Sequence, residues 1–202
     1  KDGIFLMVAV KEGKLGRKDA IFGFVRHIWT KRPSSTYNNR MDLTAVCQTA
    51  QTIAREAGAY LRQGLDQPKQ IRQKSSAIDW VTQYDTGSEA LIRQRLAEAF
   101  PDHGFYGEES GHQVIDNRYV WYVDPIDGTT NFAHGVPFFS VSLALYENGR
   151  PLVGVIYDPM RDECFHAITG QGAFVTQAGV TKRCCVSQTA DLSTALLATG
   201  FS

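Results

Sequence analysis

Apolar residues recur at steps of three or four over residues 43–61, the spacing that places them on one face of a helix. Asp42 stands just before this run and belongs to the residue types that cap helix N-termini, so the pattern predicts an amphipathic helix. A second helix is predicted over residues 85–100, opened by Asp85 or Ser88 and closed before the proline that follows.

The remaining hydrophobic runs are short and rich in aromatic and β-branched residues, as strands are. An Asn148-Gly149 turn between two apolar runs predicts a hairpin, and a second hairpin is predicted around Gly170-Gln-Gly172. The coarse order is therefore helix, strand, helix and then mostly strands. The predicted strands are 119–123, 138–146, 151–157, 163–168 and 173–176, and one more begins at 196–199.

Composition narrows the class of protein. The 202 residues are 43% hydrophobic and 21% charged, which is typical of a globular chain, and the longest apolar run is too short to span a bilayer. Twenty-one basic and twenty-one acidic residues cancel, which argues against a nucleic-acid binder. We therefore expect neither nucleic-acid nor membrane partners. The four cysteines form no C-x-x-C pair, which favours reduced thiols and a cytoplasmic location.

The charge is unevenly distributed along the chain. Residues 1–40 carry nine basic and three acidic residues, a net charge of +6, so the remaining residues carry −6. We interpret residues 1–40 as a basic leader without a function of its own. A targeting peptide is the alternative, although the segment lacks the continuous apolar stretch of a secretory signal.

The residues that suggest chemistry gather between positions 108 and 130. Asp124 and Asp127 are separated by Pro125 and Ile126, so a tight turn would bring both carboxylates to one side with the Ile126 carbonyl between them. Carboxylate and carbonyl oxygens suit a hard cation, and this spacing therefore indicates a magnesium site rather than a zinc site.

The flanking residues extend this site. Gly128 allows the backbone to approach a ligand closely, and Thr129 offers a hydroxyl and an N–H group that would bind phosphate if a helix begins there. Glu108 and Glu109 supply further carboxylates earlier in the chain. Each piece alone has an ordinary explanation, since Asp-Gly is a common turn and adjacent glutamates are usually solvated. An EF-hand is excluded because the twelfth position from Asp124 is glycine.

These motifs resemble the inositol monophosphatase family of magnesium-dependent, lithium-sensitive phosphatases. The resemblance rests on residues 124–132, on 107–110 before them, and on the lysine and aspartate segment 74–85. It runs from about Met41 to the last residue, Ser202. It implies an α+β chain, the N-terminal portion of the layered α/β sandwich of the inositol monophosphatase and fructose-bisphosphatase-like fold, with two helices against a large antiparallel sheet.

The resemblance also implies metal ligands. Glu108, Asp124 and the Ile126 carbonyl would hold the first Mg²⁺, and Asp124 and Asp127 would hold a second one, with Asp124 bridging. Two such ions clamp the attacking and leaving oxygens of an in-line displacement. Mg²⁺ is thus the expected cofactor.

The remaining matched residues are implied to handle water and phosphate. Thr129, hydrogen-bonded to Asp85, would orient the metal-activated water, while the N–H groups of Gly128 and Thr129 hold the phosphate. Glu109 and Lys74 would act behind the metal ligands or through water. The implied catalytic residues are Asp85, Glu108 and Thr129. The implied substrate contacts are Glu108, Asp127, Gly128 and Thr129.

One departure from the family concerns its C-terminal part. No Trp-Asp-x-Ala-type motif follows Asp127, so the chain is expected to lack the aspartate that completes the second metal site. We therefore divide the chain into the leader, an N-terminal α+β metal-binding domain over 41–190, and the start of a truncated C-terminal domain over 191–202. As it stands, the chain is expected to be nearly inactive and prone to associate.

We predict that the protein is a phosphomonoesterase that hydrolyses inositol monophosphate, a small phosphomonoester. A homodimer of the full-length protein is compatible with this prediction. A catalytically crippled remnant is the alternative from another class. Histidinol phosphate, nucleotides and sugar bisphosphates stay open as substrates, because the missing segment would line the alcohol side of the pocket.

Overall fold

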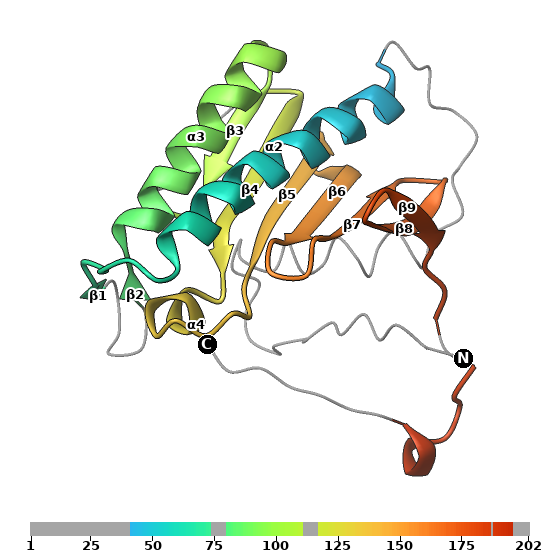
Figure 1. Cartoon of the computed structure of the whole chain (residues 1–202). Coiled ribbons are helices and arrows are strands. Elements are labelled where there is room, and N and C mark those ends of the chain that lie inside the picture. The colour runs from blue at the N-terminus through green and yellow to red at the C-terminus, as the bar shows by residue number, and fades with distance from the viewer. Residues whose placement is uncertain (1–40, 74–79, 111–116, 187, 196–202) are drawn as a thin grey trace.

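The computed structural model describes residues 41–73, 80–110, 117–186 and 188–195 (Figure 1). The helices are α2 (Leu43–Gly64), α3 (Gln83–Ala99), α4 (Thr129–Ala133) and the 3-10 helix η1 (Leu192–Thr194). The strands are β1 (Arg72–Gln73), β2 (Trp80–Val81), β3 (Gly104–Gly107), β4 (Tyr119–Asp127), β5 (Ser140–Glu147), β6 (Arg150–Asp158), β7 (Glu163–Ile168), β8 (Gly172–Gln177) and β9 (Val180–Arg183).

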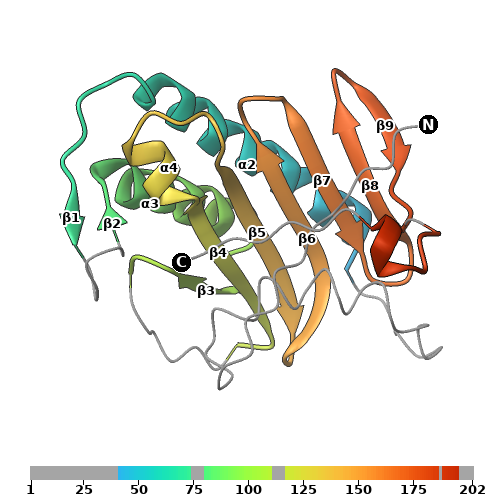
Figure 2. The ribbon, with the colours of Figure 1, turned by 90° about the horizontal axis from the view of Figure 1, so that it is seen from below.

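The described residues form two layers. A seven-stranded sheet has the order β3-β4-β5-β6-β7-β8-β9, and the long helices α2 and α3 lie side by side on one of its faces (Figures 1 and 2). The short strands β1 and β2 form a separate antiparallel pair near the start of α3. This arrangement confirms the predicted α+β class, with two helices against a large sheet.

Helix α2 begins where the sequence predicts. The carboxylate of Asp42 accepts the N–H groups of Thr44 at 2.9 Å and Ala45 at 3.2 Å, which satisfies two of the backbone donors left free at a helix start. The helix runs to Gly64, three residues past the predicted end. Its apolar face packs on β5, β6 and β7. The side chains buried there include Val46, Ala50, Ile53, Ala57 and Leu61.

Helix α3 begins earlier than predicted, because its N-cap is Thr82 rather than Asp85 or Ser88. The Thr82 hydroxyl accepts the N–H of Tyr84 at 3.1 Å, and the Asp85 carboxylate reaches back to the N–H of Thr82 at 2.7 Å. The Thr82 side chain also accepts from the backbone of Asp85, so Thr82 and Asp85 form a capping box, in which Asp85 is the third helical residue and not the cap. The helix ends at Ala99, before the proline, as predicted.

Both predicted hairpins are present in the sheet. Asn148 and Gly149 have φ values of 48° and 76°, the left-handed pair that a two-residue turn between β5 and β6 requires. Strands β7 and β8 pair around the second turn. Strand β9 was not predicted and extends the sheet by pairing with β8.

The sheet differs from the expected antiparallel one at its other edge. Strand β3, which begins and ends with glycine and was not predicted, pairs parallel with β4. Because parallel neighbours end at the same edge, the residues after Gly107 lie beside those after Val123. This edge carries the candidate site.

The core lies between the helices and the sheet, where Trp121, Phe132 and Leu143 are almost completely buried. Within the described segments, every helix is too short or too polar to cross a membrane. Three predictions fall outside the described residues: the leader 1–40, the strand at 196–199 and the placement of Lys74.

Candidate active site

Strand β4 ends in an irregularity that determines how Asp124 and Asp127 are oriented. Asp124 pairs with Ser142 and Asp127 pairs with Ser140, so three steps along β4 match two steps along β5. Side chains three apart in a regular strand point to opposite faces, and the extra residue of this β-bulge restores the phase. The tight turn expected from the sequence is therefore a bulge in a continuing strand, and it still brings both carboxylates to one side.

Ile126 anchors the bulge from within. Its side chain is buried in the core, its N–H donates to the Asp124 carboxylate at 3.2 Å, and its carbonyl accepts the Thr129 hydroxyl at 3.0 Å. The neighbouring Pro125 carbonyl accepts a hydrogen bond from Ser88 Oγ of α3 at 3.2 Å. The acidic segment is thus held by the core on one side and by α3 on the other.

Thr129 and Asp85 are joined by a hydrogen bond of 2.9 Å between Oγ1 and Oδ1. The other oxygen of Asp85 accepts the N–H and the hydroxyl of Thr82, each at 2.7 Å, and Asp85 is only 1% exposed. Thr129 has a single hydroxyl proton for its two acceptors, Asp85 and the Ile126 carbonyl. Its oxygen lone pairs are therefore left to accept a proton from a further donor such as water.

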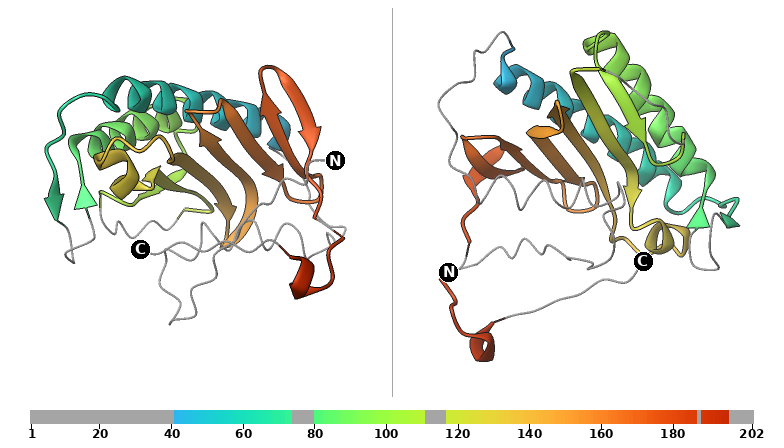
Figure 3. Two further views of the ribbon diagram at one scale, coloured as in Figure 1. Left: turned by 60° about the horizontal axis from the view of Figure 1, so that its bottom comes forward. Right: turned by 180° about the vertical axis from the view of Figure 1, so that it is seen from behind.

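Gly128 makes the turn from β4 into α4. Its φ of 98° lies in the left-handed region, and a side chain there would come within 3.2 Å of the Phe138 carbonyl oxygen. The helix α4 begins at Thr129, which agrees with the expectation that the chain becomes helical after the aspartates. Figure 3 shows this short helix at the end of β4.

Glu108 and Glu109 follow β3 and reach the site from the neighbouring strand. The Glu108 N–H donates to the Val123 carbonyl at 3.2 Å, one residue before Asp124. The N–H groups of Glu109 and Ser110 donate to the carboxylate of Glu89, at 2.7 and 2.8 Å. Parallel pairing therefore places Glu108 next to the aspartates, as the sequence separation allowed.

The site draws on two residues that the sequence analysis missed, Ser88 and Glu89 of α3. With Asp85 they occupy positions i, i+3 and i+4, which share one helix face. The three side chains are 1%, 0% and 4% exposed. The available signal was three polar residues at a helical spacing in a helix whose later buried positions are apolar.

The acidic side chains of Glu108, Asp124 and Asp127 lie close enough to influence one another's charge. Burial raises the pKa of Asp124 well above its usual range, and the negative charges of Glu108 and Asp127 and a hydrogen bond with Glu108 raise it further. The pKa of Asp127 is raised by burial and then by the charge of Glu108. Asp124 keeps some exposure to solvent, but protein atoms surround its carboxyl group. A bound cation would stabilise the ionised form of both aspartates.

The donor set fits magnesium by its chemistry. Three carboxylates and the Ile126 carbonyl are hard oxygen donors, without a sulfur or imidazole ligand among them. Among the described residues, however, no three Asp, Glu, His or Cys side chains already form a group that could hold a metal ion. The charge of Glu108 nevertheless acts on both Asp124 and Asp127, and a side-chain hydrogen bond joins Glu108 to Asp124.

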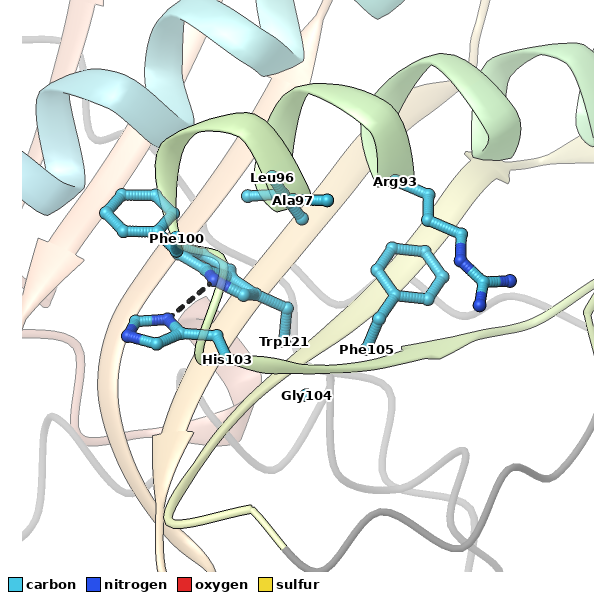
Figure 4. A pocket seen from close by; sticks show the side chains of 8 residues that line it. All are labelled: Arg93, Leu96, Ala97, Phe100, His103, Gly104, Phe105 and Trp121. Atoms are coloured by element: carbon cyan, nitrogen blue, oxygen red, sulfur yellow. Dashed lines mark hydrogen bonds between the residues drawn. The ribbon is translucent and has the colours of Figure 1, made fainter.

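A cavity of about 260 Å³ lies elsewhere, beside the second half of α3 (Figure 4). Its lining includes Leu96, Phe100, Phe105 and Trp121. The indole N–H of Trp121 donates to His103 Nδ1 at 3.1 Å, and the His103 ring stacks on Phe100. None of the predicted site residues lines this cavity, so it is separate from the candidate active site.

Comparisons with known proteins agree with the fold and with the motifs. The inositol monophosphatase family model matches residues 42–202. Inositol monophosphatase 2 of Solanum lycopersicum is 42% identical over 151 residues, which are 72% of this chain and 55% of that protein. The chain spans about half the length of the curated relatives it matches.

Solved structures share the architecture. The extragenic suppressor protein suhB of Bartonella henselae superposes with a TM-score of 0.67 at 40% identity, over 72% of this chain and 55% of that one. An IMPase/NADP phosphatase complexed with Mg²⁺ and phosphate has a TM-score of 0.60 at 28% identity, over 66% of this chain and 51% of that one. The fold is therefore the N-terminal portion of a layered α/β phosphatase fold. The chain belongs to the inositol monophosphatase family.

Proposed function

We propose that this chain carries the metal and phosphate site of a Mg²⁺-dependent phosphomonoesterase that hydrolyses inositol monophosphate by attack of water. Family membership supports the broader class, a phosphatase. The observation that carries the finer proposal is the hydrogen bond between Thr129 and buried Asp85, beside a cluster of three carboxylates.

In this proposal the acidic residues hold the metal. Glu108, Asp124 and the Ile126 carbonyl would hold one Mg²⁺, and Asp124 and Asp127 would hold a second one. When bound, the ions supply positive charge that stabilises the transferring phosphoryl group and lowers the pKa of water. The IMPase/NADP phosphatase whose structure includes Mg²⁺ and phosphate supports this choice of metal.

The neighbouring residues then orient water and phosphate. The Thr129 hydroxyl donates a hydrogen bond to Asp85, so its oxygen would accept a hydrogen bond from the attacking water and orient that water for attack. The N–H groups of Gly128 and Thr129, at the turn into α4, would bind the phosphate oxygens. Glu109 and Lys74 would act through water, Lys74 from outside the described residues.

A phosphate-release assay with inositol 1-phosphate tests the proposal. In the full-length protein, Asp124→Asn should lower the Mg²⁺-dependent rate by at least about 100-fold, because it removes a charge that both ions would share. Asp66→Asn, the same chemical change at an exposed position of the same domain, serves as the control. Wild-type turnover by Asp124→Asn at saturating Mg²⁺ would contradict the assignment. Histidinol phosphate, a nucleotide 3′-phosphate and fructose bisphosphate in parallel reactions identify the preferred substrate.

A magnesium-binding chain without turnover is the second candidate. Calorimetry with Mg²⁺ alongside the phosphate assay separates the two candidates, because such a chain would bind the ion and release no phosphate.

Location and assembly complete the proposal. All four cysteines are free, which supports a reducing compartment such as the cytoplasm. Phe138 and Val136 after α4 are 58% and 44% exposed, and large apolar side chains at a surface support a homodimer of the full-length protein. Sedimentation of the wild type and of Phe138→Ser tests the dimer.

A further inference from the structure

The buried face of α3 begins with three polar residues, and each of them bonds a different segment of the candidate site. Asp85 accepts from Thr129, Ser88 donates to the Pro125 carbonyl, and Glu89 accepts the N–H groups of the Glu108–Ser110 segment. Asp85 already has a part in the proposed function. Glu89 has none, although a buried carboxylate is costly unless its oxygens are satisfied.

Glu89 holds its segment with both oxygens. Oε2 accepts the N–H of Glu109 at 2.7 Å, and Oε1 accepts the N–H of Ser110 at 2.8 Å. These distances are typical of hydrogen bonds to a charged acceptor. The carboxylate also lies directly against Gly107, where a Cβ atom would be 2.4 Å from Glu89 Cδ. Only glycine at 107 allows this approach.

The result is a backbone held from two sides. The Glu108 N–H donates to Val123 of β4, and the next two N–H groups donate to Glu89 of α3. Three successive amides are therefore fixed, and the segment after β3 is bonded to β4, the strand that carries Asp124, and to α3. Figures 1 and 3 show α3 lying over β3 and β4. The direction in which the Glu108 side chain leaves the backbone is set by these bonds.

We infer that Glu89 is a positioning residue, which holds the backbone of Glu108 so that its carboxylate can share a cation with Asp124. The inference rests on the proposed function, since it assigns Glu108 to the metal. Glu89 acts only through the backbone and contacts neither metal nor substrate. Residues that orient metal ligands in this way typically contribute about 10-fold to 100-fold in metal affinity.

Glu89→Gln probes this role with almost no change in shape. Glutamine has one acceptor and one NH₂ donor at its end, so one of its two branches would face an N–H group of the backbone. One hydrogen bond is lost and a donor–donor contact takes its place. Glu98→Gln makes the same chemical change on the exposed side of the same helix and is the matched control.

The first measurement is calorimetric titration of the full chain with Mg²⁺ alone. We expect binding to weaken by about 10-fold to 100-fold in Glu89→Gln and to stay at the wild-type value in Glu98→Gln. In the full-length protein at saturating Mg²⁺, the phosphate-release rate of Glu89→Gln should return close to the wild-type rate, because Glu89 does not touch reacting atoms. A purely structural role would lower the urea midpoint and leave Mg²⁺ affinity unchanged.

The second measurement reads the hydrogen bonds themselves. In ¹H–¹⁵N spectra, the amide protons of Glu109 and Ser110 should resonate downfield in the wild type and move upfield in Glu89→Gln. If that variant does not fold, Gly107→Ala displaces the same carboxylate from the other side and should weaken Mg²⁺ binding similarly. The double variant should lose little more than either single one.

The outcomes separate the two proposals. Wild-type Mg²⁺ affinity in folded Glu89→Gln, or in Gly107→Ala, would overturn the positioning role and leave the proposed function standing. A wild type that does not bind Mg²⁺ would overturn the proposed function, and the positioning role with it.

Discussion

Helices α2 and α3 lie side by side on the same face of one sheet, yet they bury different chemistry. The buried positions of α2 are apolar or small from Val46 to Gly64. The buried positions of α3 are polar at Asp85, Ser88 and Glu89 and become apolar only at Ile92 and Leu96. The two helices differ because they cover different strands. Helix α3 packs on β4, and the end of β4 carries the acidic cluster.

The two helices of this layer therefore contribute differently, α2 mainly to the stability of the fold and the first half of α3 mainly to the geometry of the candidate site. An apolar side chain buried under α2 stabilises the fold by about 1.5–3 kcal/mol. A buried polar side chain contributes less to stability, since its hydrogen bonds only replace those it made with water. What α3 gains from its polar half is control over the positions of Thr129, Pro125 and the segment after β3. We therefore expect changes in α2 to alter stability and changes in the first half of α3 to alter the site.

The largest expected effect is that of Asp85→Asn on the proposed reaction. Asparagine would present an NH₂ group to Thr129 or to Thr82, so the Thr129 proton would lose its carboxylate acceptor. The phosphate-release rate should fall by about 10²-fold to 10⁴-fold, while the free energy of unfolding falls by about 1–3 kcal/mol. Asp66→Asn is again the control, and a loss of stability without a loss of rate would break the contrast between the helices.

Leu61→Ala in α2 should have the opposite profile. Leu61 is 0% exposed, so truncation leaves a cavity in the core and should lower the free energy of unfolding by about 2–5 kcal/mol. Urea denaturation measures this change. Calorimetry at a temperature where the variant is folded should give the wild-type Mg²⁺ affinity. If Mg²⁺ binding weakened as much as in an α3 variant, α2 would also position the site.

Asp42→Ala tests the same helix at its exposed start. The substitution removes the acceptor for the N–H groups of Thr44 and Ala45 and should lower the free energy of unfolding by about 1 kcal/mol. Asp42→Asn keeps a capping oxygen and should retain most of that stability. Equal losses in the two variants would show that the cap contributes nothing.

The smallest effect concerns pH at the apolar end of α3. Burial lowers the pKa of His103 below its ordinary value of 6.5, although the charge of Asp102 opposes this. As pH falls through about 6.5, the unfolded chain therefore binds the proton first, and folding stability decreases until His103 is also protonated in the folded state. In urea denaturation between about pH 7 and pH 5, His103→Phe should lose less stability than the wild type. Equal pH slopes would contradict the prediction.

Local patterns were enough to predict much of the fold. The N-cap at Asp42, the amphipathic α2 and both hairpins depend on neighbours in sequence, and the structure confirms them. The start of α3 was predicted wrongly because Asp85 is a common cap residue, while the capping box that begins at Thr82 depends on two side chains acting together. Strand β3 was missed because its two glycines hide the alternation, and only pairing with β4 makes it a strand.

For the candidate site, the sequence by itself determined which chemistry is present. It supplied the acidic residues, the glycine and the threonine at spacings that indicate a cation and a phosphate. Only the tertiary structure decided how they meet, because a β-bulge changes the phase of Asp124 and Asp127 and parallel pairing brings Glu108 beside them. It also decided the parts of Ser88 and Glu89, whose partners lie 37 and about 20 residues away along the chain. Hydrogen bonds at such separations follow from packing, and no local pattern encodes them.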